Sequence, residues 1–267
     1  MDKYAPVGVF DSGIGGLTVA RAIHKLLPDE RLVYFGDTAH LPYGDKSSAA
    51  IQAYSIKIAD VLISEGCKVI VIACNSASSA AYELVKEYVA SKAVVINVID
   101  PMIEYVIKKF KGKRVGLIGT RQTIQSETYL KKIKEKDANF SLSSLTTALL
   151  VPMIEEGFIK DKISHDVIGK YLMDKKLENI DALILGCTHY PLIKSEIESY
   201  LKEVEAIDSS EIVAEHLKGI LSKSNLLSDG SNGKNKFYVS DYTDSFEKLT
   251  RRFFGEQIHL VKHKLWE

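Results

Sequence analysis

The sequence has few cysteines and no excess of positive or negative charge. Each of these two features excludes a class of protein. Only three cysteines occur in 267 residues, Cys67, Cys74 and Cys187, too few and too scattered for the disulfide framework of a small secreted protein. Thirty-five basic residues balance thirty-five acidic ones, so the chain has no general attraction to phosphate and we expect no nucleic-acid partner. Hydrophobic residues at 46% and charged residues at 26% are typical of a folded globular protein and exclude a disordered or fibrous one.

Long hydrophobic runs are also absent. The longest are Val69 to Cys74 and Ala148 to Ile154, far shorter than the roughly 20 residues that span a membrane, so we expect no membrane association. The first six residues lead directly into a strand-like run, without a charged and then apolar targeting segment. We therefore expect a cytoplasmic protein whose thiols stay reduced, and in which an important cysteine is more often chemical than structural.

Short runs rich in Val and Ile alternate with longer segments of helical period. We expect strands over residues 7–10, 32–35, 69–73, 94–99, 115–118, 182–185, 237–239 and 258–261. We expect helices between them over residues 17–27, 49–65, 76–90, 125–135 and 192–202. Strands that are apolar on both faces and separated by helices predict an α/β fold with mostly parallel sheets, covered on both sides.

The two halves of the chain have similar spacing. Cys74 follows a strand 63 residues after Asp11, which itself ends a strand, and Cys187 follows a strand 67 residues after Thr120. We therefore predict two similar α/β domains, each with a cysteine at the carboxyl end of a strand. Ligands bind at that end of open α/β sheets, so the active site is expected in the cleft between the domains.

The tail of the chain is too short for a third core, and we expect it to complete the first domain. The predicted first domain comprises residues 1–99 and 209–267, and the second comprises residues 100–208. The chain would cross between them near Asp100-Pro101 and again near Asp208-Ser209-Ser210.

Cys74 and Cys187 have matching settings in the sequence. Each ends an apolar strand and is followed by residues that suit a helix start, Asn75-Ser76 in one case and Thr188-His189 before Pro191 in the other. Unpaired N–H groups at a helix start favour anionic ligands and lower the pKa of a thiol. The alternative is that both are small buried hydrophobes. Cys67 has no such setting, and we predict that it only packs in the hydrophobic core.

His189 is two residues from Cys187, and a nearby imidazole is a standard way to activate a thiol. By itself it could equally be a surface histidine at a helix cap. The two residues lack the paired spacing of a structural zinc site, so we expect no metal.

Two glycine-rich stretches follow the first two predicted strands. The run from Asp11 through Ser12 to Gly16 has Thr18 where a dinucleotide fingerprint requires Gly or Ala, and it lacks the lysine of a phosphate-binding loop. Its backbone N–H groups suit an anion, in our interpretation a carboxylate, although Asp11 could simply cap the next helix. Residues 36–44 could by composition be an ordinary connecting loop.

Together these stretches resemble the glutamate racemase family, within the cofactor-independent aspartate and glutamate racemases, over nearly the whole chain. The matching motifs are Phe10-Asp11-Ser12-Gly13-Ile14-Gly15-Gly16-Leu17-Thr18-Val19, Gly36-Asp37-Thr38-Ala39 with Pro42-Tyr43-Gly44, Ala73-Cys74-Asn75, Gly119-Thr120 with Thr123, and Gly186-Cys187-Thr188-His189-Tyr190-Pro191-Leu192. The resemblance implies two α/β domains with L- or D-glutamate between them, no cofactor, a homodimer, and a role in supplying D-glutamate for peptidoglycan.

The resemblance also implies the residues of the site. Its catalytic cysteines correspond to Cys74 and Cys187, assisted by Asp11 beside the first and by Glu155 and His189 beside the second. Glu156 is an immediate rival for Glu155. The implied substrate contacts are Asp11, Ser12, Tyr43, Gly44, Asn75, Ser76, Thr120, Thr188 and His189. Ser76 departs from the family, which usually has Thr there.

Two cysteines suit racemisation because one group must take the α-proton and another must return a proton to the opposite face. By resemblance, Cys74 would act on D-glutamate and Cys187 on L-glutamate. An aspartate racemase of the same superfamily is a close rival. A hydrolase with Cys187 as nucleophile and His189 as base would leave Cys74 unexplained, and the remaining alternative is a carboxylate-binding protein that kept the fold.

Overall fold

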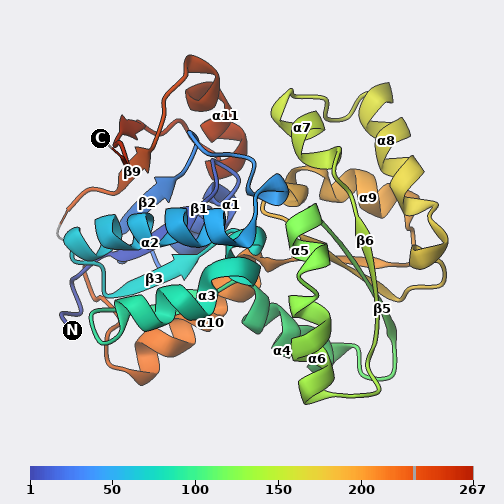
Figure 1. The fold of residues 1–267 in the computed structure, drawn as a ribbon, viewed down its shortest axis with the longest axis horizontal. Coiled ribbons are helices and arrows are strands. Elements are labelled where there is room, and N and C mark those ends of the chain that lie inside the picture. Colours follow the sequence, from blue (N-terminus) through green and yellow to red (C-terminus); the bar gives the residue numbers. More distant parts are fainter. Residues whose placement is uncertain (231–232, 267) are drawn as a thin grey trace.

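The computed structural model describes residues 1–230 and 233–266 and contains two parallel sheets (Figure 1). The first has the strand order β10-β9-β2-β1-β3-β4 and the second the order β6-β5-β7-β8. The strands of the first sheet are β1 (Val7–Asp11), β2 (Leu32–Gly36), β3 (Val69–Ile72), β4 (Val94–Asn97), β9 (Lys236–Val239) and β10 (Val261–Lys262). Those of the second are β5 (Arg114–Gly119), β6 (Ser141–Thr146), β7 (Ala182–Gly186) and β8 (Glu205–Asp208). Every strand pair described is parallel, which confirms the predicted fold class.

The topology repeats between the sheets. The order β2-β1-β3-β4 in the first corresponds to β6-β5-β7-β8 in the second, so β1 corresponds to β5 and β3 to β7. Cys74 follows β3 and Cys187 follows β7. The two cysteines therefore occupy equivalent places at the carboxyl ends of equivalent strands.

Helices cover both faces of the first sheet. They are α1 (Leu17–Leu26), α2 (Ser48–Ser64), α3 (Asn75–Val89), α10 (Ser209–Lys223) and α11 (Asp244–Phe254). Alternate strand residues face opposite ways: Phe10 and Ile70 share a core with α2 and α3, whereas Val9 and Val71 share one with α1 and α10. This alternation explains why these strands are apolar at every position. We call this sheet and its helices the first lobe.

The second sheet carries its own helices, α5 (Arg121–Gln125), α6 (Thr128–Lys136), α7 (Leu150–Glu155), α8 (Lys162–Leu172) and α9 (Lys194–Tyr200). We call this group the second lobe; Figure 1 shows the lobes side by side. Three short 3-10 helices are also present: η1 (Tyr43–Asp45), η2 (Lys175–Leu177) and η3 (Tyr190–Ile193). No helix within the described residues is both long and apolar enough to span a membrane.

The chain passes between the lobes twice. α4 (Ile99–Lys109) leads from β4 to β5, and α10 follows β8 and packs against both α1 and α4. At the first crossing Asp100 pairs with Lys132 of α6 at 2.6 Å, and at the second Asp208 caps α10 through the backbone N–H of Ser210. The strands of the first sheet lie within residues 7–97 and 236–262, and those of the second within 114–208; the domain boundaries at 99/100 and 208/209 stay a prediction.

Several sequence expectations need correction. The strand expected over residues 94–99 ends at Asn97, because the Asn97 side chain accepts hydrogen bonds from the N–H groups of Ile99 and Asp100 and starts α4. The helix expected over 125–135 begins only at Thr128, as α6, and the separate short helix α5 precedes it. Glu127, between the two helices, has a left-handed φ of 55°. The last strand is β10, two residues at a sheet edge rather than residues 258–261.

Candidate active site

A cavity of about 220 Å³ lies where the carboxyl ends of both sheets meet. Pockets for drug-sized ligands have about 300–1,000 Å³, so this one suits a smaller molecule. Eleven of the twelve residues predicted for the site line it: Ser12, Tyr43, Gly44, Cys74, Asn75, Ser76, Thr120, Glu155, Cys187, Thr188 and His189. The twelfth, Asp11, is fully buried behind this wall.

Cys74 is the N-cap of α3, and its sulfur accepts a hydrogen bond from the backbone N–H of Ala77 at 3.4 Å. It also lies 3.7 Å from the Ser12 hydroxyl. Burial, followed by the negative charge of Asp11, raises the pKa of the Cys74 thiol to about 12, against the smaller lowering effects of Ala77 and Ser12. The N–H of Ala77 at the helix start lowers this pKa, as expected, but the net shift is upward because desolvation of a thiolate outweighs one N–H contact.

Asp11 ends β1 and connects the two lobes. One carboxylate oxygen accepts a hydrogen bond from the Gly13 N–H at 3.0 Å, and the other from the Thr188 hydroxyl at 3.3 Å. Burial raises the pKa of Asp11, although the charge of His189 and the N–H groups of Gly16 and Gly13 oppose the increase. Gly16 is the N-cap of α1, so Asp11 is not itself the N-cap residue, although its carboxylate interacts with the Gly16 N–H at the start of this helix.

Cys187, His189 and Glu155 form a chain of contacts on the other side of the cavity. Nδ1 of His189 lies 3.8 Å from the Cys187 sulfur, and Nε2 lies 2.9 Å from Oε1 of Glu155. Burial disfavours the imidazolium, but the contacts with Cys187 and Glu155 outweigh it and raise the pKa of His189 to about 10. His189 is therefore protonated at pH 7, only 5% exposed, and not the surface histidine that was the alternative.

Two glycines allow the lobes to come close together at the cavity. A Cβ on Gly15 would lie 2.4 Å from Nδ1 of His189, and one on Gly44 would lie 2.7 Å from Cβ of Thr120. Both distances are far below van der Waals contact, so neither position can hold a side chain unless its neighbour shifts. We predicted backbone N–H groups facing an anion in the first stretch; the structure adds close approach as a second reason for glycine there.

A cluster of hydroxyls joins the lobes beside Cys74. Ser76 on α3 lies 2.9 Å from Thr120 and 3.4 Å from Thr123, at the start of α5. The neighbouring Asn75 accepts a hydrogen bond from the buried Tyr129 hydroxyl at 2.8 Å. These contacts use the hydroxyl that Ser76 shares with Thr, so the departure from the family motif keeps the polar contact.

The loop with Tyr43 and Gly44 is anchored by a buried carboxylate. Asp37, fully buried, accepts hydrogen bonds from the Tyr43 hydroxyl at 2.6 Å and the Ser240 hydroxyl at 2.7 Å, and lies 2.7 Å from Nδ1 of His40. Burial and the charge of Asp37 raise the pKa of Tyr43 well above its usual value. Residues 36–44 are therefore not an ordinary connecting loop but a fixed wall of the cavity.

Some residues that line the cavity have no recognisable signal in the sequence. Ala148, Val151 and Pro152 line it from α7 and the preceding turn, and Arg121 lines it beside Thr120. Arg121 pairs with Asp45 across the lobes at 2.7 Å. The only signal for Arg121 in the sequence was its position just after the end of a strand.

Cys67 is 3% exposed and packs against Gly8 and Leu62. It is therefore a buried core residue, as predicted.

Within residues 1–230 and 233–266, no group of three or more His, Cys, Asp or Glu side chains is arranged to hold a metal ion. The polar side chains that line the cavity are thiols, hydroxyls, one amide, an imidazolium, the guanidinium of Arg121 and carboxylates. They can bind a small zwitterion and move protons.

Comparison with known proteins agrees with this geometry. The family model for Asp/Glu/Hydantoin racemases matches residues 15–217. The glutamate racemase of Persephonella marina is 43% identical over 259 residues, 97% of each chain, and that of Neisseria gonorrhoeae is 36% identical over 263 residues, again 97% of each.

Solved structures give the same result for the fold. The structure of glutamate racemase from Francisella tularensis in complex with D-glutamate has a TM-score of 0.92 at 39% identity, and covers 98% of both chains. A glutamate racemase isoform from Bacillus anthracis has a TM-score of 0.92 at 36% identity, also over 98% of both. By fold, by the cavity and by likeness over nearly its whole length, the chain belongs to the glutamate racemase family.

Proposed function

We propose that the protein interconverts L- and D-glutamate without a cofactor, and that Cys74 and Cys187 act as two acid/base groups on opposite faces of the α-carbon. The observation that carries the proposal is that these cysteines, from equivalent strands of the two lobes, line one small cavity. The relative from Francisella tularensis, crystallised with D-glutamate, supports glutamate as the substrate. The product would supply peptidoglycan synthesis.

With L-glutamate bound, the Cys187 thiolate takes the α-proton and becomes a thiol, while the Cys74 thiol gives its proton to the opposite face and becomes a thiolate. With D-glutamate bound, the same two transfers run in reverse. The high pKa of Cys74 in the empty cavity suits its role as proton donor to the carbanion-like centre. When Cys74 must act as the base, the ammonium group of the bound substrate provides a positive charge that stabilises its thiolate.

The assisting groups differ on the two sides. The His189 imidazolium, held by Glu155, stabilises a negative sulfur on Cys187 and can exchange a proton with it. Asp11 is a buried carboxyl behind Cys74 whose charge opposes that of a thiolate, so a proton shared between the two would relieve the repulsion. N–H groups and hydroxyls at fixed positions around the cavity hold the carboxylates of the substrate.

The deciding experiment is circular dichroism of L- or D-glutamate incubated with purified protein. After dialysis against a chelator, the signal of either enantiomer should decay to zero, with no absorbance from bound pyridoxal phosphate. Racemisation of aspartate alone would reassign the substrate. Activity that is lost on dialysis and restored by a divalent metal would overturn the two-thiol mechanism. The homodimer stays a prediction, which sedimentation of the purified protein would check.

A further inference from the structure

We infer that Phe253 is a positioning residue, which holds the imidazole of His189 in the orientation that contacts Glu155 and Cys187. Phe253 lies on α11 of the first lobe, whereas His189 follows β7 of the second. The two ring centroids are 5.2 Å apart and the ring planes meet at 79°. This edge-to-face arrangement is a favoured geometry of aromatic pairs. The consequence for catalysis rests on the proposed function, whereas the positioning does not.

The other contacts of His189 do not fully determine the orientation of its ring. Glu155 and Cys187 contact the two ring nitrogens, and the Gly15 backbone fills the space beside Nδ1. The contact with the Cys187 sulfur is long, at 3.8 Å, so the two nitrogen contacts leave the ring some freedom to rotate, and packing against Phe253 reduces that freedom. The charge of Asp11, behind the cavity wall, also interacts with this imidazole. Phe253 thus provides an apolar contact to a ring whose two nitrogens both have polar partners.

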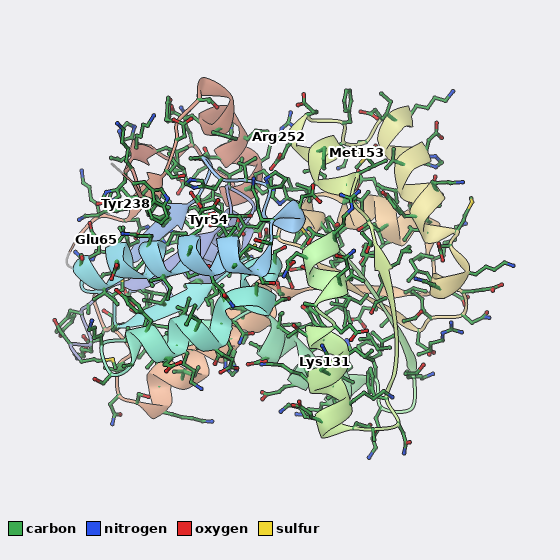
Figure 2. The ribbon with its side chains drawn as sticks, in the orientation of Figure 1. Tyr54, Glu65, Lys131, Met153, Tyr238 and Arg252 are labelled. Carbon is green, nitrogen blue, oxygen red and sulfur yellow. The ribbon has the colours of Figure 1, made fainter. Side chains whose placement is uncertain are left out.

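α11 also approaches the turn that follows Glu155. Gly157, two residues after Glu155, has a left-handed φ of 83°, and a Cβ there would lie 2.9 Å from Nη1 of Arg252. Figure 2 labels Arg252 at the end of α11 that adjoins α7, where Met153 is labelled. Arg252 and Phe253 are consecutive, so one turn of α11 reaches both His189 and the backbone two residues after Glu155.

The next residue of the helix is a matched control. Phe254 is 4% exposed, as buried as Phe253 at 1%. Its ring packs against Phe237 at 5.2 Å and against His24 at 5.9 Å, within the first lobe. Phe254→Leu removes the same atoms from the same helix without touching His189.

The first test uses no substrate. At pH 7, NMR of 15N-histidine-labelled protein should show a slowly exchanging proton on Nε2 of His189, since this N–H faces Glu155 and is buried. Phe253→Leu should speed its exchange with water at least tenfold, and Phe254→Leu should leave it unchanged. Phe253→Tyr keeps the ring and can extend its hydroxyl into the neighbouring cavity of about 740 Å³ that Phe253 also lines, so it should preserve the signal.

The second test is kinetic. Phe253→Leu should lower kcat for glutamate about tenfold with KM changed less than twofold, and both Phe253→Tyr and Phe254→Leu should stay within twofold of the wild type. Equal effects of the two leucine variants on kcat and on the His189 proton would overturn the inference. If the wild-type protein does not racemise glutamate but the proton signal depends on Phe253 as described, the positioning stands and the proposed function fails.

Discussion

Glu155 and His189 are 2.9 Å apart, and this contact separates two adjacent glutamates that the sequence alone left as rivals. Glu155 lines the cavity, whereas Glu156 is exposed at the end of α7 and does not line it. Geometry therefore favours Glu155 as the assisting carboxylate. Its role in catalysis stays a prediction that a pair of isosteric substitutions can test.

Glu155→Gln should lower kcat by about 10- to 100-fold, because a hydrogen bond to a charged group contributes about 1.5–3 kcal/mol. Glu156→Gln is the matched control and should stay within twofold of the wild type. Steady-state kinetics from both enantiomers measures the effect. Damage from the Glu156 change alone would show that our assignment is off by one residue.

The two cysteines should be separable by the face they serve. Each of Cys74→Ser and Cys187→Ser should reduce racemisation at least about 100-fold, since general acid/base groups contribute about 10²–10⁴ in rate. Incorporation of solvent deuterium should fall more from L-glutamate in Cys187→Ser and more from D-glutamate in Cys74→Ser. Cys67→Ala, a change to the third buried cysteine, should retain activity. Full activity in either serine variant would refute the two-thiol mechanism.

The close approach at Gly15 predicts a site that cannot accept a methyl group. Gly15→Ala places a Cβ 2.4 Å from the His189 ring, so the lobes must separate or the imidazole must turn. We expect a loss of about 1–3 kcal/mol in stability and a kcat at least tenfold lower. Gly219→Ala, in α10 with no atom within 4 Å of the added Cβ, should instead gain about 0.5–1 kcal/mol. Thermal melts and kinetics of both variants give the comparison.

Stability should depend on pH through His189. Its pKa rises from 6.5 to about 10 on folding, against the effect of burial, because of Cys187 and Glu155. The stabilisation is fully present below about pH 6.5 and is lost as pH rises through about 10. Between pH 6.5 and 8.5 the melting temperature of the wild type should therefore fall more than that of His189→Gln. Parallel curves for the two proteins would contradict a raised pKa.

A buried ion pair secures the first lobe away from the site. Lys68 and Glu30, 0% and 1% exposed, are 2.7 Å apart, and Lys68 also donates to the carbonyl groups of Lys3 and Leu226. Glu30→Ala should cost about 3–5 kcal/mol because it leaves a buried charge unpaired. Glu205→Ala breaks the half-exposed pair with Lys109 and should cost far less, because solvent screens an exposed ion pair. Urea denaturation of both variants measures the contrast.

Patterns confined to single elements were predictable from the sequence. Strands apolar on both faces, such as β1 and β3, were found nearly to the residue, and so were the cysteines at their ends. β6 was missed because Ser141–Thr146 is polar and lies at a sheet edge, although the repeat of β2-β1-β3-β4 requires a strand there.

Features that depend on contacts between distant residues were not predictable. The setting of Phe253 beside His189, 64 positions earlier, has no local signature in the sequence. The high pKa of Cys74 is another case, since the helix start was visible in the sequence but the depth of burial was not. A single sequence shows which titratable side chains lie at strand ends. The packing of the two lobes then determines the pKa of each of these side chains.

The repeat of strand order gives the proposed reaction an internal symmetry that the proposed assisting groups break, with Asp11 on one side and His189 with Glu155 on the other. Enantiomers have equal free energies in water, so the equilibrium constant is one and kcat/KM for glutamate must be the same in both directions. Unequal flanking groups cannot make the enzyme favour one enantiomer at equilibrium. They can change kcat and KM individually for each enantiomer. In any variant on either side of the cavity, however, the ratio kcat/KM must remain the same for L- and D-glutamate.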